Sequence, residues 1–276
     1  MTLLQAAILA IVQGFTEFLP ISSSAHLALA PWLLGWKDQG LVFDISLHFG
    51  TLLAVVLYFF RDWMQIASQG FGLQWGRDPE LQRHPRLLWL LALASVPVGV
   101  AGLLFKDHAE TVLRNPLLIG GMLVGVGIVM YLADSIGKQN KRIGEVNLSD
   151  AIWVGAAQAL AIVPGTSRSG ITIAAGLLRG MDRPSAARFS FLLSTPAVFA
   201  AAAKAFYDLY QQGGIPAGME AAFALGIAAS AITGCLAIAI LLRYLRVNGL
   251  RIFVYYRVIF GIIVIALALF FRPQAE

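Results

Sequence analysis

The sequence predicts an all-α polytopic membrane protein that forms a single transmembrane domain over residues 1–276. Hydrophobic residues make up 58% of the chain and charged residues only 13%, where soluble domains carry roughly 25% charged residues. The apolar residues gather in runs long enough to cross a bilayer, and two further runs are interrupted near their centres. A soluble core cannot use that much apolar surface, so lipid must cover it.

Six apolar runs have the roughly 17 to 25 residues that a membrane-spanning helix needs. They lie near residues 42–60, 86–105, 116–133, 187–205, 218–242 and 252–271. About six full transmembrane helices are therefore predicted.

Two other apolar runs are broken by residues that disfavour a helix. Residues 3–36 are interrupted at 20–24, and residues 149–180 are interrupted at 164–170. Each half is too short to span a bilayer. Irregular backbone at membrane depth is tolerated only where protein or a water-filled cavity surrounds it, so both runs are predicted to be re-entrant helical hairpins.

The two broken runs resemble each other. Gln13 precedes Pro20 much as Gln158 precedes Pro164, and a Ser or Thr followed by Ser comes two residues after each proline. Three spans follow each hairpin, so the second hairpin enters from the opposite side, as in an inverted-topology repeat. Repeat one is expected over about 3–133 (hairpin 3–36 plus three spans) and repeat two over about 149–271 (hairpin 149–180 plus three spans).

The basic residues predict the orientation. With the loop 61–86 in the cytoplasm, thirteen of the twenty lysines and arginines lie on the cytoplasmic side and five on the other, while Arg168 and Arg257 lie in apolar surroundings. Cytoplasmic loops carry such an excess, so the net charge of +5 indicates loop bias, and no nucleic-acid partner is expected. The single cysteine, Cys235, excludes an intrachain disulfide. The amino terminus has no basic segment, so we do not expect it to be a cleaved signal.

Ionisable side chains inside the apolar runs are few, and such costly groups are functional candidates by default. They are Glu17, His26, Asp44, His48, Arg168 and Arg257. The broken runs add the hydroxyls of Ser22, Ser23, Ser24, Thr166, Ser167, Ser169 and Thr172. Hydroxyls and exposed N–H groups at half-helix N-termini bind anionic oxygens, so this set predicts a site for a phosphorylated ligand.

Individual roles follow from residue chemistry. Arg168 is expected to clamp phosphate with two hydrogen bonds. Glu17 is expected to hold Mg²⁺, which takes one or two carboxylates plus substrate phosphates, and Gln13 lies one turn earlier on the same face. His26 is expected to act as general acid or base, and Ser23 or Ser22 beside it as a nucleophile.

Structural roles compete with these. Glu17 and Arg168 can form an internal ion pair, and hydroxyls in membrane helices often only bond backbone. Asp44 and His48, one helical turn apart, either bond each other or support the site from behind. Arg257 follows two tyrosines and either fixes helix packing or serves the site.

Two segments carry a specific resemblance to a known family. Residues 13–26, QGFTEFLPISSSAH, are similar to the first signature of the undecaprenyl-pyrophosphate phosphatase (bacitracin-resistance) family, and residues 164–172, PGTSRSGIT, to its second, P-G-x-S-R-S-x-x-T. The resemblance continues through residues 189–193 and into the last span, so it covers essentially the whole chain.

The resemblance implies an integral membrane hydrolase that converts undecaprenyl pyrophosphate to the monophosphate, recycles the lipid carrier for cell-wall peptidoglycan synthesis and confers bacitracin resistance. It implies a divalent cation, Mg²⁺ or Ca²⁺, and a site open to the extracytoplasmic side of the cell membrane. The family's serine, histidine and arginine fall on Ser23, His26 and Arg168. Its E/Q-x-x-x-E pair falls on Gln13 and Glu17, so this chain has only one carboxylate there.

Three questions stay open at this stage. Either Ser23 attacks phosphorus, or water does with His26 as the base. Transporters also use inverted repeats with broken helices, so a flippase for an anionic lipid is the alternative function, and a non-catalytic packing protein is a weaker one. The expected partners are the polyprenyl pyrophosphate and membrane lipids, with a homodimer left open.

Overall fold

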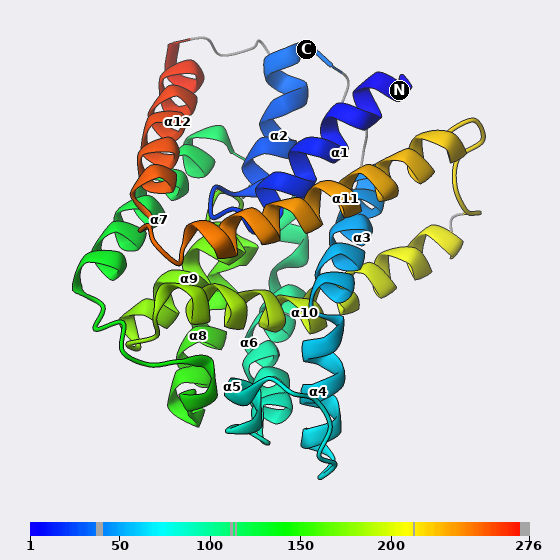
Figure 1. The fold of residues 1–276 in the computed structure, drawn as a ribbon. Coiled ribbons are helices and arrows are strands. Elements are labelled where there is room, and N and C mark those ends of the chain that lie inside the picture. The colour runs from blue at the N-terminus through cyan, green and yellow to red at the C-terminus, as the bar shows by residue number, and fades with distance from the viewer. Residues whose placement is uncertain (37–40, 111–112, 114, 212, 271–276) are drawn as a thin grey trace.

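The chain folds into helices joined by short loops. The structure is a computed structural model and describes residues 1–36, 41–110, 113, 115–211 and 213–270 (Figure 1). In chain order the α-helices are α1 (Leu3–Phe18), α2 (Ser23–Leu34), α3 (Leu41–Tyr58), α4 (Phe60–Gly70), α5 (Pro79–Gln82), α6 (Leu87–Glu110), α7 (Pro116–Ile136), α8 (Leu148–Ala159), α9 (Arg168–Leu178), α10 (Arg183–Gln211), α11 (Glu220–Tyr244) and α12 (Arg251–Phe270). Two short 3-10 helices are η2 (Ile143–Glu145) and η3 (Leu160–Ile162). The predicted all-α class is confirmed.

Among the described residues, five helices are long and apolar enough to cross a membrane: α6, α7, α10, α11 and α12. They confirm five of the six predicted spans. The remaining run, 42–60, forms α3, but the chain then bends by 71° into α4, and the two helices count as a sixth span only as a pair. The chain is therefore a multi-pass membrane protein.

The outer faces of these helices carry large apolar side chains. Leu103, Ile232 and Ile259 are 82%, 63% and 60% exposed. Each would cost free energy in water in proportion to its apolar area. A continuous apolar exterior of this kind is the surface that lipid covers.

The two predicted breaks lie where the sequence places them. α1 ends at Phe18 and α2 begins at Ser23, while η3 ends at Ile162 and α9 begins at Arg168. The residue just before each second helix is a serine in the left-handed region, with φ of 76° at Ser22 and 68° at Ser167. Such strain at a residue other than glycine costs about 1–2 kcal/mol and tends to occur at functional sites.

The backbone conformation also corrects how the two broken segments align with each other. Ser22 follows Gln13 by nine residues, and Ser167 follows Gln158 by nine, whereas alignment on the two prolines is one residue out of step. The second break has one more residue between its proline and its strained serine. Gly165, at φ 90°, takes up that residue, and an added Cβ there would meet the carbonyl oxygen of Ile119 at 2.6 Å.

Helices of the first half of the chain pack against helices of the second half. α1 packs against α11, α8 packs against α6, α3 meets α10, and α7 meets α12. Small residues permit the closest approaches, as in many membrane helix pairs. At the α7–α12 crossing a Cβ on Gly120 would meet the carbonyl oxygen of Gly261 at 2.9 Å, and a Cβ on Gly261 would meet that of Gly120 at 2.8 Å.

Ion pairs fasten the loops at one end of the bundle. Arg188 of α10 binds Asp62 of α4 at 2.6 Å and Asp78 at 2.8 Å, and Arg179 and Lys141 both bind Asp150. Burial by itself would raise the pKa of Asp78, but the hydrogen bond and charge of Arg188 outweigh it and hold that pKa below its ordinary value. These contacts fix the loops at one end of the spans.

Candidate active site

The two breaks lie directly against each other. The Ser24 hydroxyl accepts a hydrogen bond from the backbone N–H of Gly165 at 3.3 Å. In return, the Ser169 hydroxyl donates to the carbonyl oxygen of Leu19 at 3.2 Å. A hydroxyl from each break thus bonds the backbone of the other, and segments about 150 residues apart in the sequence form one site.

Glu17, in the last turn of α1, lies at the centre of this contact and is only 8% exposed. Its carboxylate accepts hydrogen bonds from the Gln13 amide at 3.0 Å and the Ser23 hydroxyl at 2.5 Å. It also forms an ion pair with Arg168, and the Nε2 atom of His48 lies 3.9 Å from it. Four residues that the sequence singles out therefore converge on one carboxylate.

Local structure explains this convergence. Gln13 and Glu17 share one face of α1 at i, i+4 spacing, while Ser23 and Arg168 are the first residues of α2 and α9. Two helix N-termini, each with N–H groups that have no partner within the helix, therefore point into the same place. One brings a hydroxyl and the other a guanidinium.

Among the remaining predicted hydroxyls, those of four serines form two pairs. The Ser22 and Ser24 hydroxyls lie 3.2 Å apart, as do those of Ser167 and Ser169, so each break repeats the same serine pair at the start of a helix. The Thr166 hydroxyl oxygen is buried and has no hydrogen-bond partner among the described residues.

Thr172 lies one helical turn after Arg168 in α9. Its hydroxyl bonds the carbonyl oxygen of Arg168 at 2.7 Å and the Ser190 hydroxyl at 2.6 Å. Thr172 therefore joins α9 to α10 and supports Arg168 through its backbone.

His26 lies in the site region but is not paired with Ser23. Its Nδ1 lies 2.7 Å from the carbonyl oxygen of Ser22, and its Nε2 lies 2.6 Å from the Tyr256 hydroxyl. Because a carbonyl oxygen only accepts, Nδ1 carries a proton, and in the neutral ring Nε2 accepts from Tyr256. The ring also stacks on Phe260 at 4.9 Å between centroids. The Ser23 hydroxyl therefore donates its hydrogen bond to the Glu17 carboxylate and not to His26.

Asp44 and His48 do bond each other, but through backbone. The Nδ1 atom of His48 donates to the carbonyl oxygen of Asp44 at 2.8 Å, which leaves Nε2 of His48 directed to Glu17. His48 thus supports the site, and Asp44 contributes its carbonyl oxygen to that support.

The residues around Glu17 suit a divalent cation held largely by its substrate. No group of three or more His, Cys, Asp or Glu residues that could bind a metal occurs in the described part of the chain. One carboxylate oxygen of Glu17 contacts Arg168, and the other faces Gln13. The Oε1 atom of Gln13 is buried and has no hydrogen-bond partner among the described residues. Glu17 and Gln13 would supply two oxygens, and Mg²⁺ commonly completes its shell with phosphates and water.

Sequence reasoning left Arg257 undecided, and the structure gives it a large role. It is fully buried and donates hydrogen bonds to carbonyl oxygens of both breaks and of α7. Tyr256, which holds His26, was not predicted. Gln158 is also fully buried, and neither polar atom of its amide has a described partner. A signal for all three existed, because each is a polar side chain inside an apolar run.

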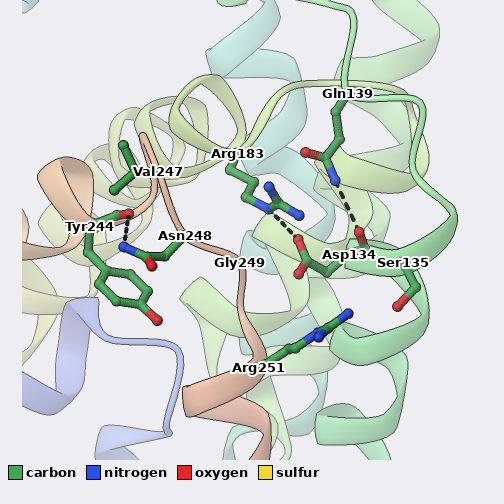
Figure 2. A pocket seen from close by; sticks show the side chains of 9 residues that line it. All are labelled: Asp134, Ser135, Gln139, Arg183, Tyr244, Val247, Asn248, Gly249 and Arg251. Carbon is green, nitrogen blue, oxygen red and sulfur yellow. Dashed lines mark hydrogen bonds and ion pairs between the residues drawn. The ribbon is translucent and has the colours of Figure 1, made fainter.

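A cavity of about 630 Å³ lies elsewhere, where α7 ends and α10 and α12 begin (Figure 2). Arg183 binds Asp134 there at 2.5 Å, and Arg251 lines the same cavity (Figure 2). None of the predicted site residues lines this cavity.

Comparisons with known proteins identify the family of this chain. Residues 6–263 match a family model described as bacitracin resistance protein BacA. An undecaprenyl-diphosphatase of Desulforudis audaxviator (strain MP104C) is 47% identical over 268 residues, which cover 96% of this chain and 97% of the relative. The undecaprenyl-diphosphatase of Moorella thermoacetica (strain ATCC 39073 / JCM 9320) is 46% identical over 266 residues, 96% of this chain and 98% of the relative. The chain belongs to the bacitracin resistance protein BacA family.

Proposed function

We propose that this chain is an undecaprenyl-diphosphatase, which hydrolyses the lipid pyrophosphate to the monophosphate and inorganic phosphate. One observation carries the proposal: Arg168, Ser23 and Glu17 meet where the N-termini of α2 and α9 converge. Relatives with this name match the chain over nearly its full length, which supports the same activity here.

The pyrophosphate binds at the two helix N-termini. Their N–H groups and the macrodipoles of α2 and α9 attract anionic oxygens, and the serine pairs add hydroxyl donors. Arg168 exchanges its contact with Glu17 for the phosphates, because a guanidinium binds two oxygens of either anion in the same fork. The polyprenyl tail then lies among the apolar faces of the helices and lipid.

The contact between Ser23 and Glu17 favours Ser23 as the nucleophile. Its oxygen attacks the terminal phosphorus, its proton passes to Glu17, and the bridging P–O bond breaks to release the lipid monophosphate. Water then hydrolyses the phosphoserine and yields inorganic phosphate. In the other route water attacks directly with His26 as base, which requires that Tyr256 first release Nε2 of His26.

A divalent cation, Mg²⁺ or Ca²⁺, is part of the proposal. Glu17 and Gln13 would hold it, and it would neutralise negative charge on the pyrophosphate. With one carboxylate, this chain is expected to bind the free ion weakly and the ion with its substrate more tightly.

The two broken segments, 3–36 and 149–180, are proposed as re-entrant hairpins of an inverted repeat whose halves are about 3–133 and about 149–271. The exchange of partners supports this, since α1 packs on α11 as α8 packs on α6. In Figure 1, α1 and α2 occupy the upper part and α8 the lower part, as expected for segments that enter from opposite sides. The repeated strained serines support the same relation.

The site is proposed to open to the extracytoplasmic side of the cell membrane. The excess of lysine and arginine in the loops 61–86, 137–147 and 243–251 supports a cytoplasmic position for that end. The first hairpin, with Glu17 and Ser23, would then enter from outside.

Phosphate release from undecaprenyl pyrophosphate by the purified protein in detergent tests the proposal. Detergent abolishes any gradient, so a flippase would bind the lipid without turnover. We expect multiple turnovers that require a divalent cation. Tight lipid binding with no phosphate release would refute the enzyme and favour the flippase.

A further inference from the structure

Arg257 of α12 joins the two breaks from behind the site. We propose that it is a positioning residue: its guanidinium holds the carbonyl side of both breaks, so that the helix N-termini of α2 and α9 meet and face the pyrophosphate. This inference rests on the proposed function for its substrate, while its structural basis is independent of it.

The contacts of Arg257 reach three segments. Nη1 donates to the carbonyl oxygen of Pro20 at 3.3 Å, and Nη2 to those of Gly165 and Thr166 at 2.9 and 3.0 Å. The carbonyl oxygens of Met122 and Leu123 in α7 accept from Nη2 and Nε at 3.2 Å each. A single side chain thus bonds the first break, the second break and the spanning helix between them in sequence.

The environment makes this arrangement costly unless it has a use. Arg257 is 0% exposed, and a guanidinium keeps its charge in proteins. Among the described residues no aspartate or glutamate forms an ion pair with it. A buried cation inside an apolar span is an expected functional group. Among the described residues, backbone carbonyl dipoles balance the charge of Arg257.

The bonded carbonyls lie next to the strained serines. Thr166 immediately precedes Ser167, at φ 68°, and Pro20 is two residues before Ser22, at φ 76°. Strained conformers persist only where their surroundings over-determine them, and Arg257 supplies that constraint to both. In the peptide between Thr166 and Ser167 the carbonyl points to Arg257, so the N–H of Ser167 points to the other side, and it donates no hydrogen bond to a described group.

The preceding residue extends the same brace. Tyr256 bonds His26 of α2 at 2.6 Å, so one turn of α12 holds both breaks and the histidine. Movement of this turn would alter the two N-termini together. We therefore expect Arg257 to affect affinity for pyrophosphate and turnover, although it touches no substrate.

The test replaces Arg257 by lysine, which keeps the charge but cannot reach all five carbonyl oxygens. Arg188→Lys is the matched control, because Arg188 is a partly buried arginine that fastens α10 to Asp62 and Asp78 outside the site. We measure kcat and KM on undecaprenyl pyrophosphate, thermal unfolding, and the shift in unfolding temperature that inorganic pyrophosphate produces. Native membranes are assayed alongside detergent, so that lipid supports the fold.

We expect Arg257→Lys to lose about 100-fold in kcat/KM, as for two charged hydrogen bonds, and to lose the stabilisation by inorganic pyrophosphate. Arg188→Lys should unfold at a lower temperature and keep kcat/KM within about threefold. Equal losses of activity per folded molecule in the two variants, or an unchanged pyrophosphate response in Arg257→Lys, would overturn the proposal. The pyrophosphate response decides the role of Arg257 even if the wild-type protein releases no phosphate, which would refute the proposed function instead.

A second variant separates positioning from general stability. Glycine adopts positive φ without strain, so Ser167→Gly makes the constraint on residue 167 unnecessary. If Arg257 acts by holding that turn, Arg257→Lys should cost several-fold less activity in the Ser167→Gly background than in the wild type. An equal loss in both backgrounds would overturn the role of Arg257 in holding the turn at residue 167.

Discussion

The two breaks have similar backbone conformations but carry different side chains at the start of the following helix. Each ends in a strained serine at the start of a helix and pairs two serine hydroxyls 3.2 Å apart. At the first helical position, however, α2 has Ser23 and α9 has Arg168. The same fold therefore presents a hydroxyl beside a carboxylate from one side and a cation from the other. In the proposed site, the repeated backbone binds the anion, and the two different side chains take different roles.

The strongest test of this division replaces the cation. Arg168→Lys keeps a positive charge but loses the fork that binds two phosphate oxygens, so kcat/KM should fall about 100- to 1,000-fold. Arg179→Lys, at the other end of α9 and bonded to Asp150, is the control. Turnover of Arg168→Lys close to that of the control would show that the Arg168 guanidinium has no role in the mechanism.

A serine on each break can be compared directly. Ser23→Ala removes the proposed nucleophile and should abolish phosphate release and the labelling of protein by substrate with a labelled terminal phosphate. Ser169→Ala loses a bond to Leu19 and the contact with the Ser167 hydroxyl, and it should keep activity within about tenfold. If Ser23→Ala stays active while His26→Ala is inactive, water is the nucleophile.

Glu17 and Gln13 test whether the first break also holds the cation cofactor. Glu17→Gln should shift the Mg²⁺ titration to about tenfold higher concentration and lower the maximal rate, while Gln13→Glu should be tolerated and shift the titration the other way. An identical Mg²⁺ titration in Glu17→Gln would leave that residue with acid–base or structural work only.

The last test labels single cysteines, and these substitutions are expected to change activity least. It asks whether the two broken segments enter the membrane from opposite sides. In a Cys235→Ala background, cysteine at Thr2 should react with an impermeant reagent on intact cells, and cysteine at Ser149 or Arg183 should react only after the membrane is opened. A cysteine pair at Ser24 and Ser169 should cross-link. Labelling of Thr2 and Ser149 from the same side would contradict the inverted repeat.

Sequence alone predicted the parts of this fold that depend on local pattern. Apolar length located the spans, and prolines with serines located both breaks, because hydrophobicity and helix interruption are properties of neighbouring residues. The convergence on Glu17 was also accessible, since ionisable groups inside apolar runs have few alternatives to each other.

Contacts between distant helices were not accessible in the same way. Pairing of His26 with Tyr256 instead of Ser23, and the bonds from Arg257 to Pro20 and Thr166, depend on how α12 packs against both breaks. The bend after α3 and the one-residue register difference depend on tertiary geometry around Tyr58 and Gly165. A single sequence holds no direct record of such partners.

The ion pair between Glu17 and Arg168 has a consequence for turnover. A carboxylate tethered beside the guanidinium is a built-in competitor at high effective concentration, so any departing anion is replaced at once. Inorganic phosphate and the lipid monophosphate carry less charge than the pyrophosphate and compete less well with it. In the proposed reaction, the ion pair of Glu17 and Arg168 neutralises both charges when no anion is bound, and we expect weak inhibition by both products.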